Sequence, residues 1–414
     1  MRTDFGGAGR NHCAAGSKPV QRRFIFGFQY LRIRQLQRYL DCICTARTRS
    51  RFWISDQQEQ LKIAYTQSSG LAGSILDRTR VLGSLEFAKQ FEAIVEGPKS
   101  REVSQQLEPR SEELLGALSW LTDNNETDRA LLLVSLLWSF WIDKGHVQEG
   151  RKLVTRLLKL PGAKSRTTTF GRVLYGAGML AFRQDDNKEA KRLFEECLAL
   201  SREKNDGAST VRALTGLARI ALREGDYEKV KSRSEEARRI ARIMNDEWSE
   251  TRPLHMLAAA TKMEGNLQRA RELYLENLAL ARKLGDQSLE SVELDNLGSV
   301  ALHTGDVGGA KDWYRQAGEI MYKQRSMYML PYLPLHFSMV ALEEGKLERA
   351  VKLLGASETL FESSGMAPDP DESVERDRTV SRLRKAVDED KFSRLWEEGR
   401  KLSLDQAVQY AFET

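Results

Sequence analysis

The chain repeats one pattern of polar and apolar positions every 40 residues. A polar turn recurs with this step, and the glycines in its later copies are Gly225, Gly265, Gly305 and Gly345. Two earlier copies place Gly145 and Asp185 at the corresponding position. A glycine there supplies the left-handed backbone conformation that ends a helix. These copies in one unbroken register predict a repeat protein in which each unit packs on its neighbours.

Apolar residues keep fixed distances from this turn. In the clearest unit, Ala301 lies four residues before the turn glycine and Ala310 five residues after it. Spacings of three, four and seven residues place such side chains on one face of a helix. A second turn has the same period, and each copy is followed by an aspartate that can cap the next helix; it contains Asn205, Asn245 and Gly285. Each unit is therefore predicted to be helix A, a turn, helix B and a second turn.

The predicted fold is all-α, namely a right-handed α-solenoid superhelix of about six helix-turn-helix repeats with helical caps. Only nine prolines in 414 residues agree with long helices. The expected divisions are a basic, poorly ordered extension in residues 1–80, N-terminal capping helices in 81–130, six repeats in 131–370 and C-terminal capping helices in 371–414.

The register of small and large residues resembles the tetratricopeptide repeat. The positions that carry the resemblance in the clearest unit are Leu297, Gly298, Ala301, Ala310, Tyr314 and Ala317. The period differs, because it is 40 residues here and usually 34 in that motif. The longer period lengthens the helices by somewhat more than one turn in total. We therefore expect a TPR-like array with longer helices.

Both ends of the array resemble a wider family. Near its start, Ala117–Leu121 reads Ala-Leu-Ser-Trp-Leu, and Trp138–Trp141 reads Trp-Ser-Phe-Trp before a Gly-His turn. Near its end, Trp396–Val408 reads Trp-Glu-Glu-Gly-Arg-Lys-Leu-Ser-Leu-Asp-Gln-Ala-Val. Residues 107–414 are similar to the C-terminal sensor region of bacterial LuxR-type and maltose-activator-like STAND regulatory ATPases. The resemblance implies a sensor and oligomerisation arm, and therefore possible self-association. No Gly-x-x-x-x-Gly-Lys-Ser/Thr motif occurs in the sequence, so ATPase activity does not carry over.

The net charge of +5 is unevenly distributed. Residues 1–53 contain eleven Lys or Arg and two acidic residues, a balance of +9, which leaves −4 for the rest of the chain. Within this part, residues 21–39 mix aromatic and arginine side chains. They could form a basic amphipathic helix on a membrane or nucleic acid, a transit peptide, or residues added by an upstream start. No apolar run is long enough to span a membrane, and four cysteines are too few for a disulfide framework, so a cytoplasmic location is expected.

Residues that could support catalysis or bind metal are scattered. The five histidines form no metal-ligand motif, and Cys42 and Cys44 lack a second pair. Cys197 and the aromatic cluster around Trp138 are interpreted as core. The acidic run Asp369–Glu372 could hold a cation, but a solvated linker is the favoured interpretation. We therefore expect no enzyme activity, no cofactor and no metal.

A series of basic residues marks the most informative surface. Arg172, Arg212 and Arg252 each lie thirteen residues before the turn position, where helix A faces the concave side of such a superhelix. The predicted groove is basic in repeats two to four and apolar in the last two. Its proposed lining also includes Arg183, Arg219, Arg223, His255, Lys262, Tyr332 and Met339. The alternative is a solvated arginine-rich face with no ligand.

The function expected from the sequence is a non-enzymatic scaffold for signal transduction and transcription regulation. It would bind a protein, an acidic peptide with a hydrophobic end, or a small ligand, like the sensor arm that it resembles. Direct DNA binding by the repeats is not expected. The alternatives are a stand-alone adaptor or co-chaperone that binds acidic peptides, and an ATPase regulator whose nucleotide-binding half lies outside this sequence.

Overall fold

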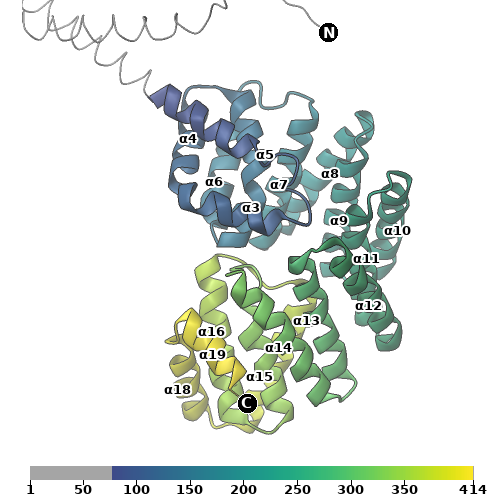
Figure 1. The fold of residues 1–414 in the computed structure, drawn as a ribbon. Coiled ribbons are helices and arrows are strands. Elements are labelled where there is room, and N and C mark those ends of the chain that lie inside the picture. Colours follow the sequence, from purple (N-terminus) through teal and green to yellow (C-terminus); the bar gives the residue numbers. More distant parts are fainter. Residues whose placement is uncertain (1–76, 414) are drawn as a thin grey trace, which may run out of the picture. The chain divides into compact units, whose positions relative to one another are not determined.

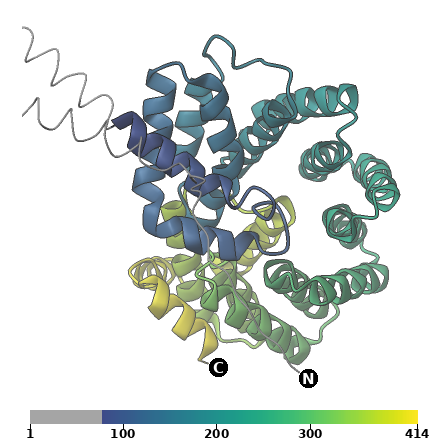
Figure 2. The same cartoon turned by 45° about the horizontal axis from the view of Figure 1, so that its top comes forward.

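A computed structural model of the protein describes residues 77–413, and the regular structure in this part is helical. Figure 1 shows helices joined by short turns, and Figure 2 shows successive helix pairs following one another around a curve. This arrangement confirms the all-α solenoid of helix-turn-helix repeats. The predictions for the basic segment 21–39 and for Cys42 and Cys44 lie outside the described residues.

The N-terminal part begins with helical residues 77–89, followed by α3 (Ser100–Leu107), the 3-10 helix η1 (Glu108–Arg110) and α4 (Ser111–Asp123). The six helix A and helix B pairs are α5 (Thr127–Lys144) with α6 (Val147–Leu157), α7 (Thr168–Arg183) with α8 (Asn187–Glu203), α9 (Gly207–Arg223) with α10 (Tyr227–Ile243), α11 (Glu247–Met263) with α12 (Leu267–Leu284), α13 (Gln287–His303) with α14 (Val307–Lys323), and α15 (Tyr332–Glu343) with α16 (Leu347–Ser364). The chain then forms α17 (Pro370–Ala386), α18 (Glu389–Arg400) and α19 (Leu404–Phe412).

The turns use the residues that the sequence pattern indicated. Gly305 follows α13 with φ = 81°, and Asp185 adopts φ = 60° at the equivalent position after α7. In the second kind of turn, the Asp286 carboxylate accepts a hydrogen bond from the Leu289 N–H at 3.0 Å, which caps α13. These local contacts end one helix and start the next, so they fix the 40-residue period.

The small residues allow close packing of helix A on helix B. A Cβ atom added to Gly298 would lie 2.6 Å from the Tyr314 ring, so this position requires glycine. Ala310 and Tyr314 are both fully buried. Cys197 is also fully buried, and burial raises the pKa of its thiol to about 12. The predictions of the repeat register and of a core role for Cys197 are confirmed.

The aromatic cluster near the start of the array is also core. Trp138, Phe140 and Trp141 are buried, and Trp138 packs edge-on against Tyr175 of the next repeat with ring centroids 5.3 Å apart. A Cβ on Gly150 would lie 2.5 Å from the Trp141 ring. The interpretation of the cluster as core is confirmed, and the cluster also joins the first two repeats.

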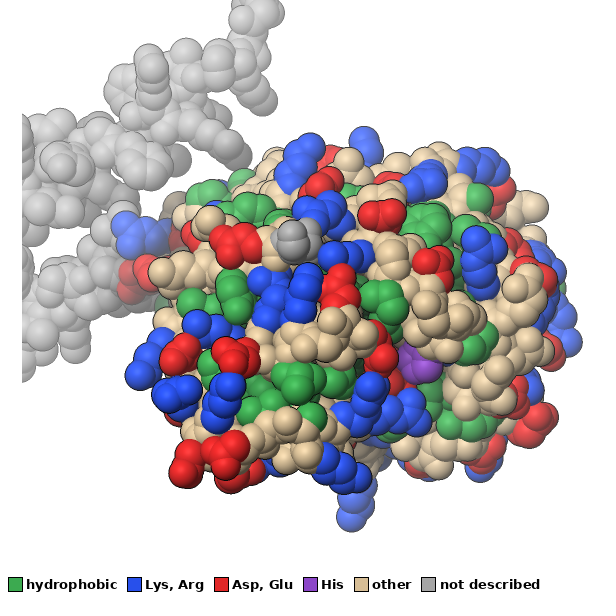
Figure 3. Space-filling view, turned by 90° about the horizontal axis from the view of Figure 1, so that it is seen from below, with side chains coloured by type: hydrophobic (Ala, Val, Ile, Leu, Met, Phe, Trp, Pro, Cys, Tyr) green, Lys and Arg blue, Asp and Glu red, His purple; other side chains and the backbone are tan. Residues whose placement is uncertain are grey.

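Ion pairs between repeats follow the same period. Lys191 pairs with Glu224, Lys231 with Glu264, and Lys311 with Glu344. On the face drawn in Figure 3, basic and acidic side chains accordingly lie next to one another over much of the surface. Such exposed pairs contribute little each. None of the helices in residues 77–413 combines the length and the apolar character required to cross a bilayer.

The C-terminal helices depart from the regular stack. The helix that packs most extensively on α16 is α18, whereas α17 contacts α9, α15 and α16. The backbones of α16 and α18 touch, because a Cβ on Gly355 would lie 2.2 Å from the Trp396 carbonyl oxygen and a Cβ on Gly399 would lie 2.0 Å from that of Lys352. This close contact gives α18 the position beside α16, and α17 lies instead against helices A of the array.

Candidate functional site

The helices A of several repeats face a common set of small cavities. One cavity, of about 40 Å³, is lined by residues of α7, α9, α11, α13 and α15 together with Asp369–Glu372. A second, of about 100 Å³, shares Arg219, His255, Val292 and Tyr328 with the first. We call the helix A surface around these cavities the inner face. The structure therefore brings Arg219, Arg252 and His255 together, although they come from two different repeats.

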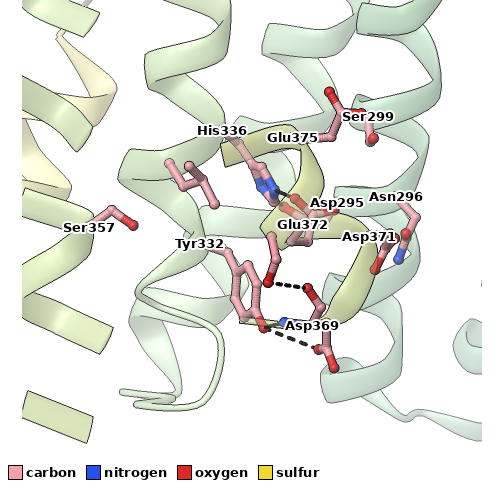
Figure 4. A network of polar contacts seen from close by, with 12 residues as sticks. Asp295, Asn296, Ser299, Tyr332, His336, Ser357, Asp369, Asp371, Glu372 and Glu375 are labelled. Atoms are coloured by element: carbon pink, nitrogen blue, oxygen red, sulfur yellow. Dashed lines mark hydrogen bonds and ion pairs between the residues drawn. The ribbon is translucent and has the colours of Figure 1, made fainter. Parts of the chain in front are cut away.

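The acidic residues 369–375 lie on the inner face, and we call them the acidic clasp. The Asp369 carboxylate accepts hydrogen bonds from the Arg183 guanidinium at 2.9 Å and from the Tyr332 hydroxyl at 3.1 Å. The Asp369 N–H in turn donates to the Tyr332 oxygen at 2.9 Å (Figure 4). Arg183 is itself buried, and it also donates to the Tyr328 hydroxyl at 2.7 Å. The prediction that this segment is a solvated linker is therefore wrong.

The second contact of the clasp involves Lys262 of α11. Its ammonium group lies 2.8 Å from the Asp371 carboxylate and 3.7 Å from that of Glu372. Burial alone would lower the pKa of Lys262, but these carboxylates outweigh burial and raise it well above the usual value. Lys262 therefore remains charged, and its charge is matched from within the chain.

His336 of α15 forms the third contact and lies between two carboxylates. Its Nδ1 lies 2.8 Å from Asp295 of α13, and its Nε2 lies 2.7 Å from Glu372 (Figure 4). The ring stacks on Tyr314 with centroids 4.7 Å apart and is fully buried. Burial lowers the pKa of His336, but Asp295 and Glu372 outweigh this effect and raise it to about 10. Burial raises the pKa of Glu372, whereas His336 and Lys262 lower it to about 2.

A fourth contact joins His303 to Glu375 at 3.2 Å. Basic groups from α7, α11, α13 and α15 thus each contact at least one acidic residue of the clasp. Sequence analysis did not identify His336 or the clasp as parts of one site. The sequence feature that could have indicated this site is the acidic run Asp369–Glu375. It contains no basic residue and comes after the repeats whose predicted groove is basic.

Glutamates from the N-terminal part contact the inner face beyond the clasp. Glu96 lies 2.7 Å from the Arg212 guanidinium and accepts a hydrogen bond from the Trp138 indole N–H at 3.1 Å. Glu92 lies 3.1 Å from the Arg172 guanidinium. We call Glu92 and Glu96 the N-terminal acid pair. Two of the three arginines at the repeated position therefore already have carboxylate partners.

The other predicted site residues have different surroundings. Arg223 pairs with Asp185 and lies over the Phe182 ring, with its guanidinium carbon 4.7 Å from the ring centroid. His255 lies 2.9 Å from the buried Glu293 carboxylate. Met339 is buried in the core, whereas Tyr332 lines the cavity of about 40 Å³. The apolar character of the last helices A serves their packing.

Arg219 and Arg252 are the exceptions among the predicted basic residues, since neither forms an ion pair with a described residue. Both line the cavity of about 100 Å³, together with Trp248, Tyr328 and Asp286. The guanidinium carbon of Arg252 lies 4.8 Å from the centroid of the Trp248 ring, which supports a cation–π contact. Two guanidinium groups therefore face one cavity without an ion pair to a described residue, although the Asp286 carboxylate also lines this cavity and the charge of Arg219 helps to lower the pKa of Asp369. In residues 77–413, no group of His, Cys, Asp and Glu side chains has an arrangement suited to a metal ion.

Comparisons with known proteins agree with this architecture. Residues 170–243 match the tetratricopeptide repeat family. A Rap protein solved in complex with competence and sporulation factor has a TM-score of 0.51 and 13% identity, covering 80% of this chain and 87% of that chain. A STAND protein with a tetratricopeptide repeat sensor from Pyrococcus horikoshii has a TM-score of 0.46 and 15% identity, covering 78% of this chain and 46% of that chain. No curated protein sequence matches the chain. The family match and the likeness to the Rap protein show a TPR-like fold.

Proposed function

We propose that the protein is a non-enzymatic regulatory scaffold that binds an acidic segment of a protein or peptide on its inner face, at Arg219 and Arg252. The observation that carries this proposal is the pairing pattern on that face. Carboxylates of the chain itself form ion pairs with Arg183, Lys262 and Arg212, while the guanidinium groups of Arg219 and Arg252 form no ion pair with a described residue. The inner face is thus suited to carboxylates, and one position for them is open.

The chemistry of the open position favours a carboxylate ligand. A guanidinium group binds a carboxylate through two parallel hydrogen bonds. Each such contact contributes about 1.5–3 kcal/mol when partly desolvated, and less when water has free access. The small cavity admits one acidic group rather than a long buried segment. The remainder of a peptide ligand would therefore lie along the more exposed surface near Ser100 and Trp248.

The proposal that the scaffold is regulatory rests on the similarity of this chain to other proteins. The Rap protein of similar fold was solved in complex with competence and sporulation factor. The ends of this array also resemble the sensor arm of STAND regulatory ATPases, in which case the arm would act with a nucleotide-binding module and self-associate. A stand-alone adaptor that binds acidic peptides would use the same two arginines.

Binding of a labelled hexaglutamate peptide to the full-length chain tests the proposal. Fluorescence anisotropy at low salt should detect binding, and the double substitution Arg219→Ala with Arg252→Ala should weaken it about tenfold or more. A hexalysine peptide should not bind. The matched control replaces two exposed arginines of helices B, Arg239→Ala with Arg271→Ala, and should retain parental affinity. Equal binding by the parent and the Arg219/Arg252 variant, or no binding by the parent, contradicts the proposal.

A further inference from the structure

A groove on a different surface of the array is much larger than the cavities of the inner face. It has a volume of about 720 Å³ and is lined by residues of α6, α7 and α8 and by Lys164. None of its residues lines the cavities of the inner face. Sites for small molecules typically have volumes of about 300–1,000 Å³. The groove is therefore large enough for a ligand of its own.

The groove exists because α6 is short. It has 11 residues, whereas α8, α10 and α12, the next helices B, have 17, 17 and 18. Accordingly, α6 contacts α7 less extensively than α8 contacts α9. A hollow is therefore left above one stripe of α7 between α6 and α8, and the side chains of that stripe are themselves nearly buried.

This stripe forms an apolar floor. Phe170, Leu174, Ala177 and Leu180 of α7 lie on one helix face, and Val154 of α6 is part of the wall. Ala181 is the last lining residue on α7, so the floor extends for about 16 Å along the helix axis. The four floor side chains are at most 6% exposed. The floor is thus long enough for an extended chain that lies along α7.

The rim of the groove is basic. Arg151 and Arg192 are neutralised, since Arg151 pairs with Asp186, and Arg192 with Glu189 and Glu196. The other basic rim residues are exposed and form no ion pair with a described residue; they are Lys159, Lys164 and Lys188. An apolar floor beneath three unpaired ammonium groups is complementary to a molecule that has an apolar body and an anionic end.

We propose that this groove binds an amphipathic carboxylate with one unbranched alkyl chain. The chain lies along α7 between α6 and α8, and the carboxylate contacts the lysines of the rim. Burial of the alkyl chain supplies most of the affinity, because each methylene removed from water contributes about 0.8 kcal/mol. The basic residues 1–53 are excluded as the occupant by charge, since their balance of +9 repels the lysines.

Titration of the full-length chain with dodecanoate, followed by calorimetry, tests this proposal. We expect one saturable site per chain and about tenfold weaker binding of dodecylamine, whose cationic end the rim repels. The substitutions Lys159→Glu, Lys164→Glu and Lys188→Glu together should weaken dodecanoate binding about tenfold and remove its salt dependence. The matched control carries the same charge change at exposed lysines far along the chain, Lys323→Glu, Lys385→Glu and Lys401→Glu, and should bind as the parent does.

The substitution Ala177→Phe supplies a second test, because its ring fills the floor of the groove. It should weaken binding about tenfold without changing the helical circular dichroism. If this variant is unstable, the triple lysine variant alone tests the proposal, because its substitutions are on the exposed rim and should not disturb folding. Parental affinity in the lysine variant, equal binding of dodecylamine, or no binding by the parent overturns the proposal. Binding of an acidic amphipathic helix but not dodecanoate also overturns it.

Discussion

The acidic clasp and the N-terminal acid pair both place carboxylates on the inner face, but they differ in the burial of their partners. Three of the four basic side chains that hold the clasp are buried, with 3% exposed for Arg183, 4% for Lys262 and 1% for His336, whereas His303 at its end is 27% exposed. Those that hold the N-terminal acid pair are 18% exposed for Arg172 and 16% for Arg212. Water and salt screen the second set and hardly reach the first. Similar ion pairs therefore have different roles: most of the clasp is part of the core, whereas the pair of Glu92, which is 43% exposed, with Arg172 is a surface contact.

Removing the central basic group of the clasp should have the largest effect. The substitution His336→Leu removes the cation between the buried carboxylates of Asp295 and Glu372, and only Lys262, 3.7 Å from Glu372, remains to offset them. Breaking a buried pair in this way costs about 3–5 kcal/mol. Urea denaturation should show this loss in the free energy of unfolding. The control His146→Leu changes a half-buried turn residue and should cost much less. A loss below 1 kcal/mol for His336→Leu would place the clasp among the surface contacts.

The second largest effect is expected in the pH dependence of stability, which should distinguish the acidic clasp from the N-terminal acid pair. The pKa of His336 is about 10 in the folded protein and 6.5 in its ordinary state, so its contribution is complete below pH 6.5 and is lost as the pH rises through 10. The pKa of Glu372 is about 2 against an ordinary 4.5, so its contribution is present above pH 4.5 and is lost as the pH falls through 2. Thermal melting should therefore show a falling Tm between pH 7 and 10, and His336→Leu should flatten this part of the curve.

The smallest effect is expected at the N-terminal acid pair. Glu92→Gln removes a carboxylate that is 43% exposed and pairs only with Arg172 at short range. Exposed pairs contribute about 0–1 kcal/mol, and salt reduces that amount. The free energy of unfolding should change by less than about 1 kcal/mol at low salt and not measurably at high salt. A loss as large as that of His336→Leu would show that the two acidic segments are equivalent.

Much of the fold was predictable, because the signals that fix it are local. The turn residues Gly305 and Asp286 and the packing pair Gly298 and Tyr314 act within one repeat, and they recur with one period. Sequence reasoning could therefore predict the helices, their order and the side of helix A on which Arg219 and Arg252 lie. It also predicted the buried state of Cys197 from its repeat position.

The clasp was not predictable, because its position depends on contacts far apart in the sequence. A Pro-Asp-Pro-Asp run has the same local preferences in a solvated linker and at the start of a buried helix. What decides between them is the close contact of Gly355 with the backbone of α18, which removes α17 from the regular stack. For the same reason, the sequence indicated that Arg183 and Lys262 face inward but not that Asp369 and Asp371 neutralise them.

The clasp has a consequence for how the array folds and unfolds. A simple solenoid has contacts only between neighbouring repeats, so it can lose its terminal repeats one at a time. Here the Ala367 N–H donates to the Arg183 carbonyl oxygen at 2.7 Å, and the Met327 N–H donates to that of Asp143 at 3.0 Å. These bonds join the second repeat to the segment after the sixth, and the first repeat to the loop before α15. During synthesis, Arg183 stays without its carboxylate until the ribosome has added Asp369, 186 residues later. Contacts between repeats that are far apart in the sequence therefore couple the two ends of the array, and its repeats should unfold together in one cooperative transition.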